Sequence, residues 1–200
     1  MIDLPTDLPA DIVPLSWLLG VWEGSGVIDY ETADHHFSGE FAHRVSFSHD
    51  GGDYVNYAAS AWLTADGTSA PLLAEQGYWR LARAATDADA GPALLPAPQP
   101  RSTPRTAEDV EALRNADGAF GLEVAIVRSD GVSELYIGQV KGPRIDLATD
   151  AIVRPASAKS YGAATRMYGY VEGHLLWAWD IAALGGALGS HASARLARAD

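Results

Sequence analysis

Residues 15–26, LSWLLGVWEGSG, are the feature that most constrains how this chain can fold. A short apolar turn ends at a glycine and continues into a strand with the pattern G-x-W-x-G-x-G. Gly20 can adopt a positive φ and so end the turn. In the extended strand Trp22, Gly24 and Gly26 share one face, because side chains alternate with a period of two. One large ring beside two missing side chains lets another backbone or a flat ligand come close, which suits the wall of a small β-barrel.

Short segments with the same period of two follow along the rest of the chain, and turn signals such as Asp130-Gly131 and Glu172-Gly173 separate several of them. The predicted strands are 21–30, 41–49, 53–64, 73–82, 120–128, 132–140, 143–149, 160–171, 174–182 and 192–198. Little helix is expected beyond a short turn over residues 11–19, with Asp11 as its N-cap. We therefore predict an all-β fold, a ten-stranded antiparallel up-and-down barrel, whose closure leaves no sheet edge exposed.

A chain of 200 residues with 48% hydrophobic residues is expected to form a single domain over residues 1–200. Residues 84–117 interrupt the strand pattern. This segment is rich in alanine and proline, and it cannot supply a ladder strand because each proline removes a donor. We interpret it as a surface excursion between two paired strands, with a short helix from Thr106 through Leu113. It is either a spacer or a lid that partly covers a pocket.

Composition excludes several functions. A formal net charge of -12 argues against binding nucleic acid or an anionic membrane through a broad basic surface. The absence of cysteine excludes disulfides and thiolate metal sites, so a metal would need histidine or carboxylate ligands or would arrive inside a cofactor. No signal peptide and no membrane-length apolar run are recognisable, and we expect a cytoplasmic protein. Its oligomeric state is left open as monomer or homodimer.

Six histidines are the main candidates for chemistry, since no G-x-S-x-G elbow and no P-loop lysine are present. His35 and His36 are adjacent, so they cannot project to the same face of a strand and share a metal. His191 lies where a loop of small residues, GGALGS, enters the last predicted strand. It is either an ordinary loop residue or an imidazole with room for a bulky group above it.

Taken together, these motifs resemble the nitrobindins, a family of haem-binding β-barrels. The resemblance covers nearly the whole chain outside residues 84–117. After the first motif the matches are Tyr30-Glu-Thr32, Phe47-Ser-His49, Glu75-Gln-Gly77-Tyr78-Trp-Arg80, the hairpin from Ser129 to Gly138, Ala158-Lys159 and Leu188-Gly-Ser-His191-Ala-Ser-Ala-Arg-Leu.

The resemblance implies that the barrel holds haem b, with His191 as the proximal iron ligand. It also implies contacts from Thr32 and Lys159 to the haem edge or propionates, while Gly20, Trp22, Gly24 and Gly26 shape the first strand. The implied activity is isomerisation of peroxynitrite to nitrate at ferric haem, together with binding of nitric oxide.

Two departures from the family pattern flank the expected ligand. Ser190 precedes His191 where the family often has Asp or Gln, and Ala192 follows it where a large apolar residue is usual. These departures are expected to weaken the support of the imidazole. Two alternatives remain: a nitric oxide sensor without enzymatic activity, and a lipocalin-like or fatty-acid-binding-protein-like carrier of a small hydrophobic ligand. The carrier would need basic side chains inside the barrel, for which Arg80 and Arg166 are candidates.

Overall fold

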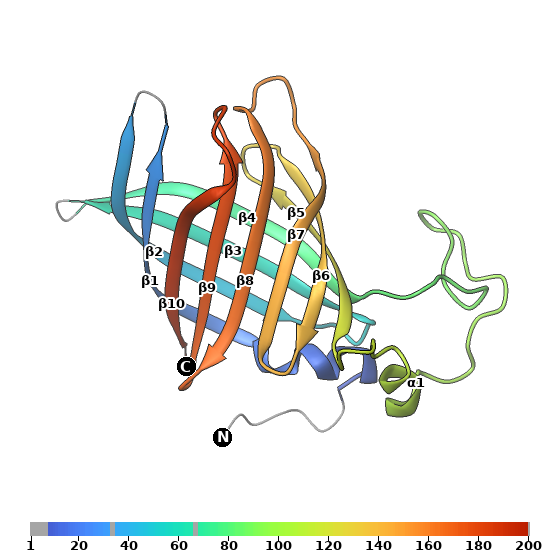
Figure 1. Cartoon of the computed structure of the whole chain (residues 1–200). Coiled ribbons are helices and arrows are strands. Elements are labelled where there is room, and N and C mark those ends of the chain that lie inside the picture. Colours follow the sequence, from blue (N-terminus) through green and yellow to red (C-terminus); the bar gives the residue numbers. More distant parts are fainter. Residues whose placement is uncertain (1–7, 33–34, 66–67, 200) are drawn as a thin grey trace.

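Ten antiparallel strands close into a barrel in which each strand pairs with its sequence neighbours and the last strand pairs with the first (Figure 1). The computed structural model describes residues 8–32, 35–65 and 68–199. The strands are β1 (Gly20–Glu31), β2 (His36–Ser48), β3 (Tyr54–Ala65), β4 (Thr68–Leu81), β5 (Phe120–Arg128), β6 (Ser133–Lys141), β7 (Arg144–Val153), β8 (Tyr161–Val171), β9 (His174–Ala183) and β10 (Gly189–Arg198). The predicted up-and-down barrel is thus confirmed.

Side-chain alternation explains why these segments form barrel strands. In β9 every second residue is buried over the full length of the strand, as an inward-facing and outward-facing alternation requires. Three strands begin earlier than their alternation predicts: β2 at His36, β4 at Thr68 and β10 at Gly189. Their first residues are largely exposed, so backbone pairing continues where the burial pattern no longer marks it.

The opening motif builds the first strand as expected. Gly20 has a φ of 123° and separates the 3₁₀ turn η1 (Ala10–Leu18) from β1. A Cβ on Gly24 would lie 2.3 Å from the carbonyl oxygen of Arg195, and one on Gly26 would lie 2.3 Å from that of Ser193. The two glycines therefore admit the backbone of β10, and the close approach predicted from the motif is that of a neighbouring strand.

Asp11 does not cap the opening turn, so that prediction was wrong. The residue at the N-cap position of η1 is Pro9, and no side chain caps the turn. Asp11 is instead buried and forms an ion pair with Arg105, whose Nη1 lies 3.1 Å from its carboxylate. Local sequence does not reveal that this carboxylate is buried against a distant loop. An aspartate is also favoured in the first turn of any helix, so both roles give the same local pattern.

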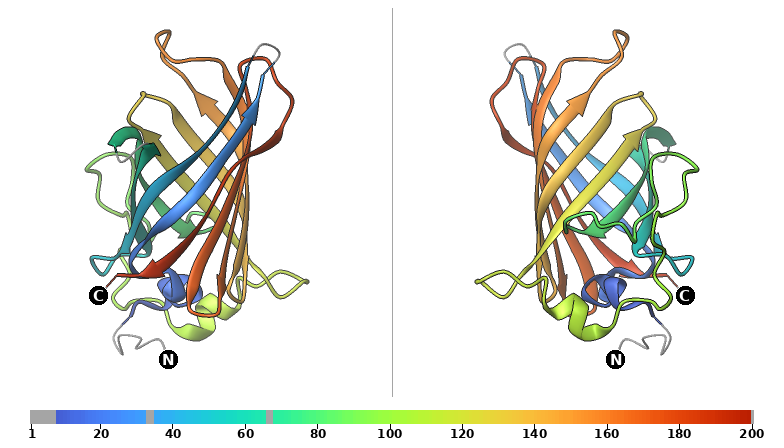
Figure 2. Two further views of the ribbon diagram at one scale, coloured as in Figure 1. Left: turned by 90° about the vertical axis from the view of Figure 1, so that its left-hand side faces the viewer. Right: turned by 90° about the vertical axis from the view of Figure 1, so that its right-hand side faces the viewer.

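The excursion over residues 84–117 connects two paired strands, β4 and β5. Its helix α1 (Ala107–Glu111) starts with the expected capping box between Thr106 and Asp109, but ends before Leu113. Figure 2 shows α1 beside η1 at one end of the barrel. The chain alternates direction along the strands, so the β7–β8 and β9–β10 turns lie at the opposite end. No helix in the described part of the chain is long and apolar enough to cross a membrane.

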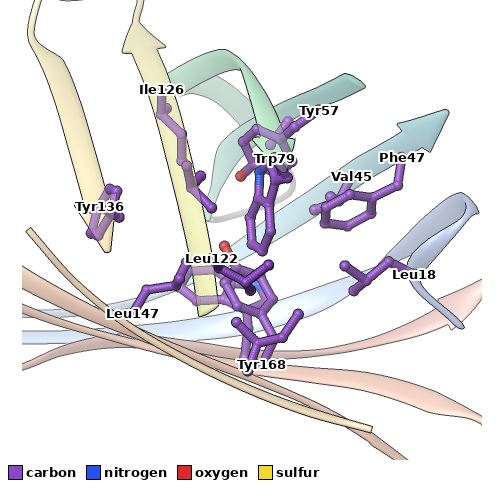
Figure 3. Close-up of a cluster of buried hydrophobic side chains, with 14 of the residues drawn as sticks. Leu18, Val45, Phe47, Tyr57, Trp79, Leu122, Ile126, Tyr136, Leu147 and Tyr168 are labelled. Atoms are coloured by element: carbon purple, nitrogen blue, oxygen red, sulfur yellow. The ribbon is translucent and has the colours of Figure 1, made fainter. Parts of the chain in front are cut away.

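The end of the barrel near η1 is filled by a hydrophobic core, part of which is drawn in Figure 3. Trp79, which is fully buried, makes edge or tilted contacts with the rings of Phe47, Tyr57 and Tyr168 at centroid distances of 5.2–5.7 Å. Such contacts each contribute about 0.5–1.5 kcal/mol beyond the burial of area. Because the core fills the end of the barrel near η1, a cavity can form toward the opposite end.

Candidate functional site

The cavity has a volume of about 450 Å³ and is lined by residues from most strands. Aromatic and aliphatic side chains form most of its wall, including Phe41, Trp177, Trp179 and Ile181. Exposed residues of the upper turns, among them Lys159 and Leu184, also line it, so the cavity reaches the surface at the end away from η1. A largely apolar, concave site of this size is typical of a binding site for a small molecule or cofactor.

His191 lies at this cavity, as expected, but inside β10 and not on a loop. The pairing of β10 with β9 shifts register between Ser190 and Ala192, so His191 occupies a β-bulge. Bulges re-aim the side chain that they carry and are common beside functional sites. β10 begins at Gly189, earlier than the sequence pattern indicated.

Two aromatic rings hold the imidazole of His191. The ring of Tyr30 lies 5.1 Å away at an interplanar angle of 89°, and that of Trp179 lies 5.5 Å away at 78°. Tyr30 is itself anchored, since its hydroxyl donates to the carbonyl oxygen of Ala183 at 2.7 Å. Edge-to-face contacts on two sides restrict the rotation of the imidazole.

His191 is neutral at physiological pH. Burial, and then the positive charge of Arg128, lower the pKa of its imidazole to about 4. A neutral imidazole can donate a lone pair to a metal. Its Nδ1 is buried and has no hydrogen-bond partner among the described residues. Among the described residues, none therefore pairs with this nitrogen to orient a ligating imidazole.

Of the two other residues expected to contact haem, Lys159 lies at the cavity and Thr32 does not. Lys159 lines the mouth of the cavity and is exposed, and it forms no ion pair with any residue in the described ranges. Thr32 is not among the residues that line the cavity. Its hydroxyl exchanges hydrogen bonds with the backbone of His35 at 3.1 Å, across the turn that follows β1. The fold thus brings Lys159, but not Thr32, to the same cavity as His191.

A second histidine of the cavity, His43, had no role in the sequence interpretation. It is buried, and its Nδ1 accepts a hydrogen bond of 2.9 Å from the indole N–H of Trp177. Burial lowers the pKa of His43 to about 4. The alternation of β2 places His43 on the same inward face as Phe41 and Val45, and this was the available signal.

A buried ion pair lies beside these rings. Arg166 donates two hydrogen bonds to Glu75, from Nη1 to Oε2 at 2.8 Å and from Nη2 to Oε1 at 2.6 Å. Tyr57 donates to the same carboxylate at 2.7 Å. Burial alone would raise the pKa of Glu75, but the charge and hydrogen bonds of Arg166 hold that pKa well below its usual range. Glu134 lies 3.4 Å from Arg166 and adds a second negative charge.

This ion-pair network affects whether the basic side chains expected of a lipid carrier are free to bind a carboxylate. Arg166 faces the interior, as that alternative requires, but two carboxylates already surround its charge. Arg80 is exposed and forms an ion pair with Glu123 at 2.6 Å. The prediction that Arg80 lies inside the barrel was therefore wrong. Alternation explains the error: Trp79 takes the inward position and turns Arg80 outward.

Comparisons with known proteins agree with the barrel fold. Residues 11–198 match the family described as THAP4-like, heme-binding beta-barrel domain. The chain is 62% identical to a protein named peroxynitrite isomerase from Leifsonia xyli subsp. xyli and 58% identical to one of the same name from Clavibacter sepedonicus, in each case over 100% of both chains. The crystal structure of Rv2717c from M. tuberculosis aligns with a TM-score of 0.68 and 26% identity, covering 97% of this chain and 100% of that one.

Proposed function

The chain belongs to the THAP4-like, heme-binding β-barrel family, and on this premise we propose that it binds haem b through His191 and isomerises peroxynitrite to nitrate. The relatives named peroxynitrite isomerase align over their full length, which supports the activity. The observation that carries the site is the neutral imidazole of His191, held between Tyr30 and Trp179 at an apolar cavity.

The residues of the cavity fit such a group. A neutral imidazole is the form that binds iron, and the aromatic wall suits a flat apolar ring system. Lys159 would hold a haem propionate at the mouth, where an ammonium group remains hydrated. Thr32 lies outside this lining, and its hydroxyl is already hydrogen-bonded to the backbone of His35. When bound, ferric haem supplies a Lewis-acidic iron for the rearrangement.

The protein's own residues have three tasks in this reaction. His191 would hold the iron, and Tyr30 and Trp179 keep its ring in one orientation. The apolar wall limits the entry of water, which would otherwise compete for the reacting anion. Peroxynitrite and nitrate contain the same atoms and carry the same charge, so no proton or electron has to be delivered. Orientation and exclusion of water are thus the main contributions of this site.

Replacement of the proposed ligand tests the assignment. Haem titrated into the apoprotein should give a Soret band and a ferric spectrum that change in His191→Ala, with lower haem affinity. His174→Ala is a matched control, because His174 lies at the β8–β9 turn at the opposite end of the barrel. An unaltered ferric spectrum and unaltered haem affinity in His191→Ala would show that another residue holds the iron.

Turnover separates the enzyme from a nitric oxide sensor. With a large excess of peroxynitrite over haem-loaded protein, an isomerase should accelerate the decay over many equivalents and yield nitrate. A sensor would react stoichiometrically at most. Native mass spectrometry of protein purified without denaturation tests the carrier alternative, since a lipid-sized mass in place of haem would favour it.

A further inference from the structure

Arg128, the last residue of β5, lies at the wall of the cavity and had no role in the sequence interpretation. Its guanidinium carbon is 4.8 Å from the ring centroid of Tyr161 and 5.6 Å from that of Trp179. The side chain is only 13% exposed. Trp179 also packs against His191, so the guanidinium and the imidazole contact the same ring.

The hydrogen-bonding capacity of Arg128 is largely unused. Its Nη2 donates to Asp130 at 2.7 Å, but Nε and Nη1 are buried and have no acceptor among the described residues. The indole Nε1–H of Trp179 is also buried and has no acceptor among the described residues. A guanidinium keeps its protons under all physiological conditions, and each buried donor without an acceptor is costly. Unpaired donors at one cavity wall indicate that an acceptor is missing.

The charges around the cavity favour a negative acceptor. Arg166 is surrounded by Glu75 and Glu134, so little of its charge acts on a ligand. The carboxylate that pairs with Arg128 belongs to Asp130, whose side chain is 42% exposed and therefore screened by water. Asp130 lines the cavity too, but the charges of Arg128 and of Lys159 at the mouth together exceed its charge, so this part of the lining is net positive in a chain whose formal net charge is -12.

We propose that Arg128 binds an oxyanion inside this cavity, next to the proposed iron site. This inference rests on the proposed function and names the charge class of its ligand. Guanidinium groups match planar oxyanions in shape and charge. A local positive site would also draw an anion into an otherwise acidic protein. The oxyanion is either a small free anion of the nitrate and peroxynitrite type or a carboxylate of the bound haem.

The test compares Arg128→Gln and Arg128→Lys with the parent protein. Arg80→Gln is the control, since it removes the same charge from the outer surface. At constant ionic strength, nitrate is titrated into the apoprotein while NMR follows the guanidinium Nε–H signal of Arg128 and the indole N–H signal of Trp179. A free-anion site predicts about ten- to hundredfold weaker nitrate binding in Arg128→Gln, as expected for losing a charged hydrogen bond. Arg128→Lys should keep part of the affinity.

A second arm identifies the haem carboxylate as the alternative source. If Arg128 holds a propionate, Arg128→Gln should lower the affinity for haem about tenfold or more but leave the affinity for haem dimethyl ester unaltered. Circular dichroism establishes that each variant is folded. If neither nitrate binding nor haem binding depends on Arg128 in a folded variant, the proposal is wrong. The nitrate arm uses apoprotein, so it gives its answer even if haem does not bind and the proposed function fails.

Discussion

The indole N–H of Trp177 donates a hydrogen bond to Nδ1 of His43 across 134 positions of sequence, from β9 to β2. An indole nitrogen can only donate, so Nδ1 must accept and the proton of the neutral imidazole lies on Nε2. This single contact sets the tautomer of a buried histidine at the cavity. It also satisfies two polar groups that would otherwise be buried without a partner.

Trp177→Phe should remove this constraint. The donor is lost while an aromatic ring remains, so we expect a loss of about 1–3 kcal/mol in the free energy of unfolding. The ¹⁵N chemical shifts of His43 should report a changed tautomer population. Trp79→Phe is the control, because the indole nitrogen of Trp79 is buried and has no acceptor among the described residues. Equal tautomer populations in Trp177→Phe and the parent would contradict the assignment.

Stability should fall between pH 6.5 and about 4. In the folded protein burial lowers the pKa of His43 to about 4, whereas the unfolded chain takes up the proton near pH 6.5. Acid therefore favours the unfolded state in this window. His43 contributes up to about 3 kcal/mol, His191, whose folded pKa is also about 4, acts in the same direction, and the effect levels off below these pKa values. The dependence of the urea-unfolding free energy on pH gives the number of protons taken up on unfolding. In His43→Gln this number should be smaller by about one than in the parent protein. Phe41→Leu, which alters a neighbouring ring without a titrating group, should keep the full slope.

Breaking the buried ion pair should be more harmful than removing it. Arg166→Met leaves Glu75 and Glu134 buried without their cation, and we expect a loss of about 3–5 kcal/mol. The double variant Arg166→Met with Glu75→Gln should recover part of this loss, because one stranded charge is gone. Chemical denaturation of both variants measures the difference. A double variant less stable than Arg166→Met would contradict this account.

The glycines of the opening motif should resist substitution for a steric reason. Gly24→Ala places a Cβ against the carbonyl oxygen of Arg195, and separating β1 from β10 to make room should cost about 1–3 kcal/mol. Gly162→Ala in β8 is the matched control, since the nearest atom to its Cβ would be 3.8 Å away. Thermal unfolding of the two variants compares them directly, and equal losses would contradict the close approach of β10.

The excursion over residues 84–117 should not influence haem binding. It lies at the end of the barrel near η1, anchored by the pairs Arg83–Asp89 and Arg105–Asp11. Replacing residues 90–104 with the same number of glycine and serine residues keeps both anchors. We expect the haem affinity of the apoprotein to remain unaltered in absorbance titrations. A clear loss of affinity would indicate that the excursion reaches the cavity after all.

Much of this fold could be predicted because its signals are local. The period of two identified every strand, and prolines marked the excursion as outside the sheet. Local signals failed where side chains meet across the barrel. Glu75 and Arg166 are 91 positions apart, and nothing in either strand indicates that they pair. The prediction of Asp11 as an N-cap failed for the same reason, because its actual partner, Arg105, lies in a loop far along the chain.

By itself, the sequence determined the ten-stranded barrel and the close packing at Gly24 and Gly26, while its resemblance to the nitrobindins indicated His191 as the residue to consider for iron. Tertiary structure decided the chemical state of the cavity: the neutral imidazoles of His43 and His191, the compensated charge of Arg166 and the unpaired donors of Arg128. The reason is physical. Alternation depends on neighbours along one strand, whereas desolvation and Coulomb interactions depend on distances that exist only once the barrel closes.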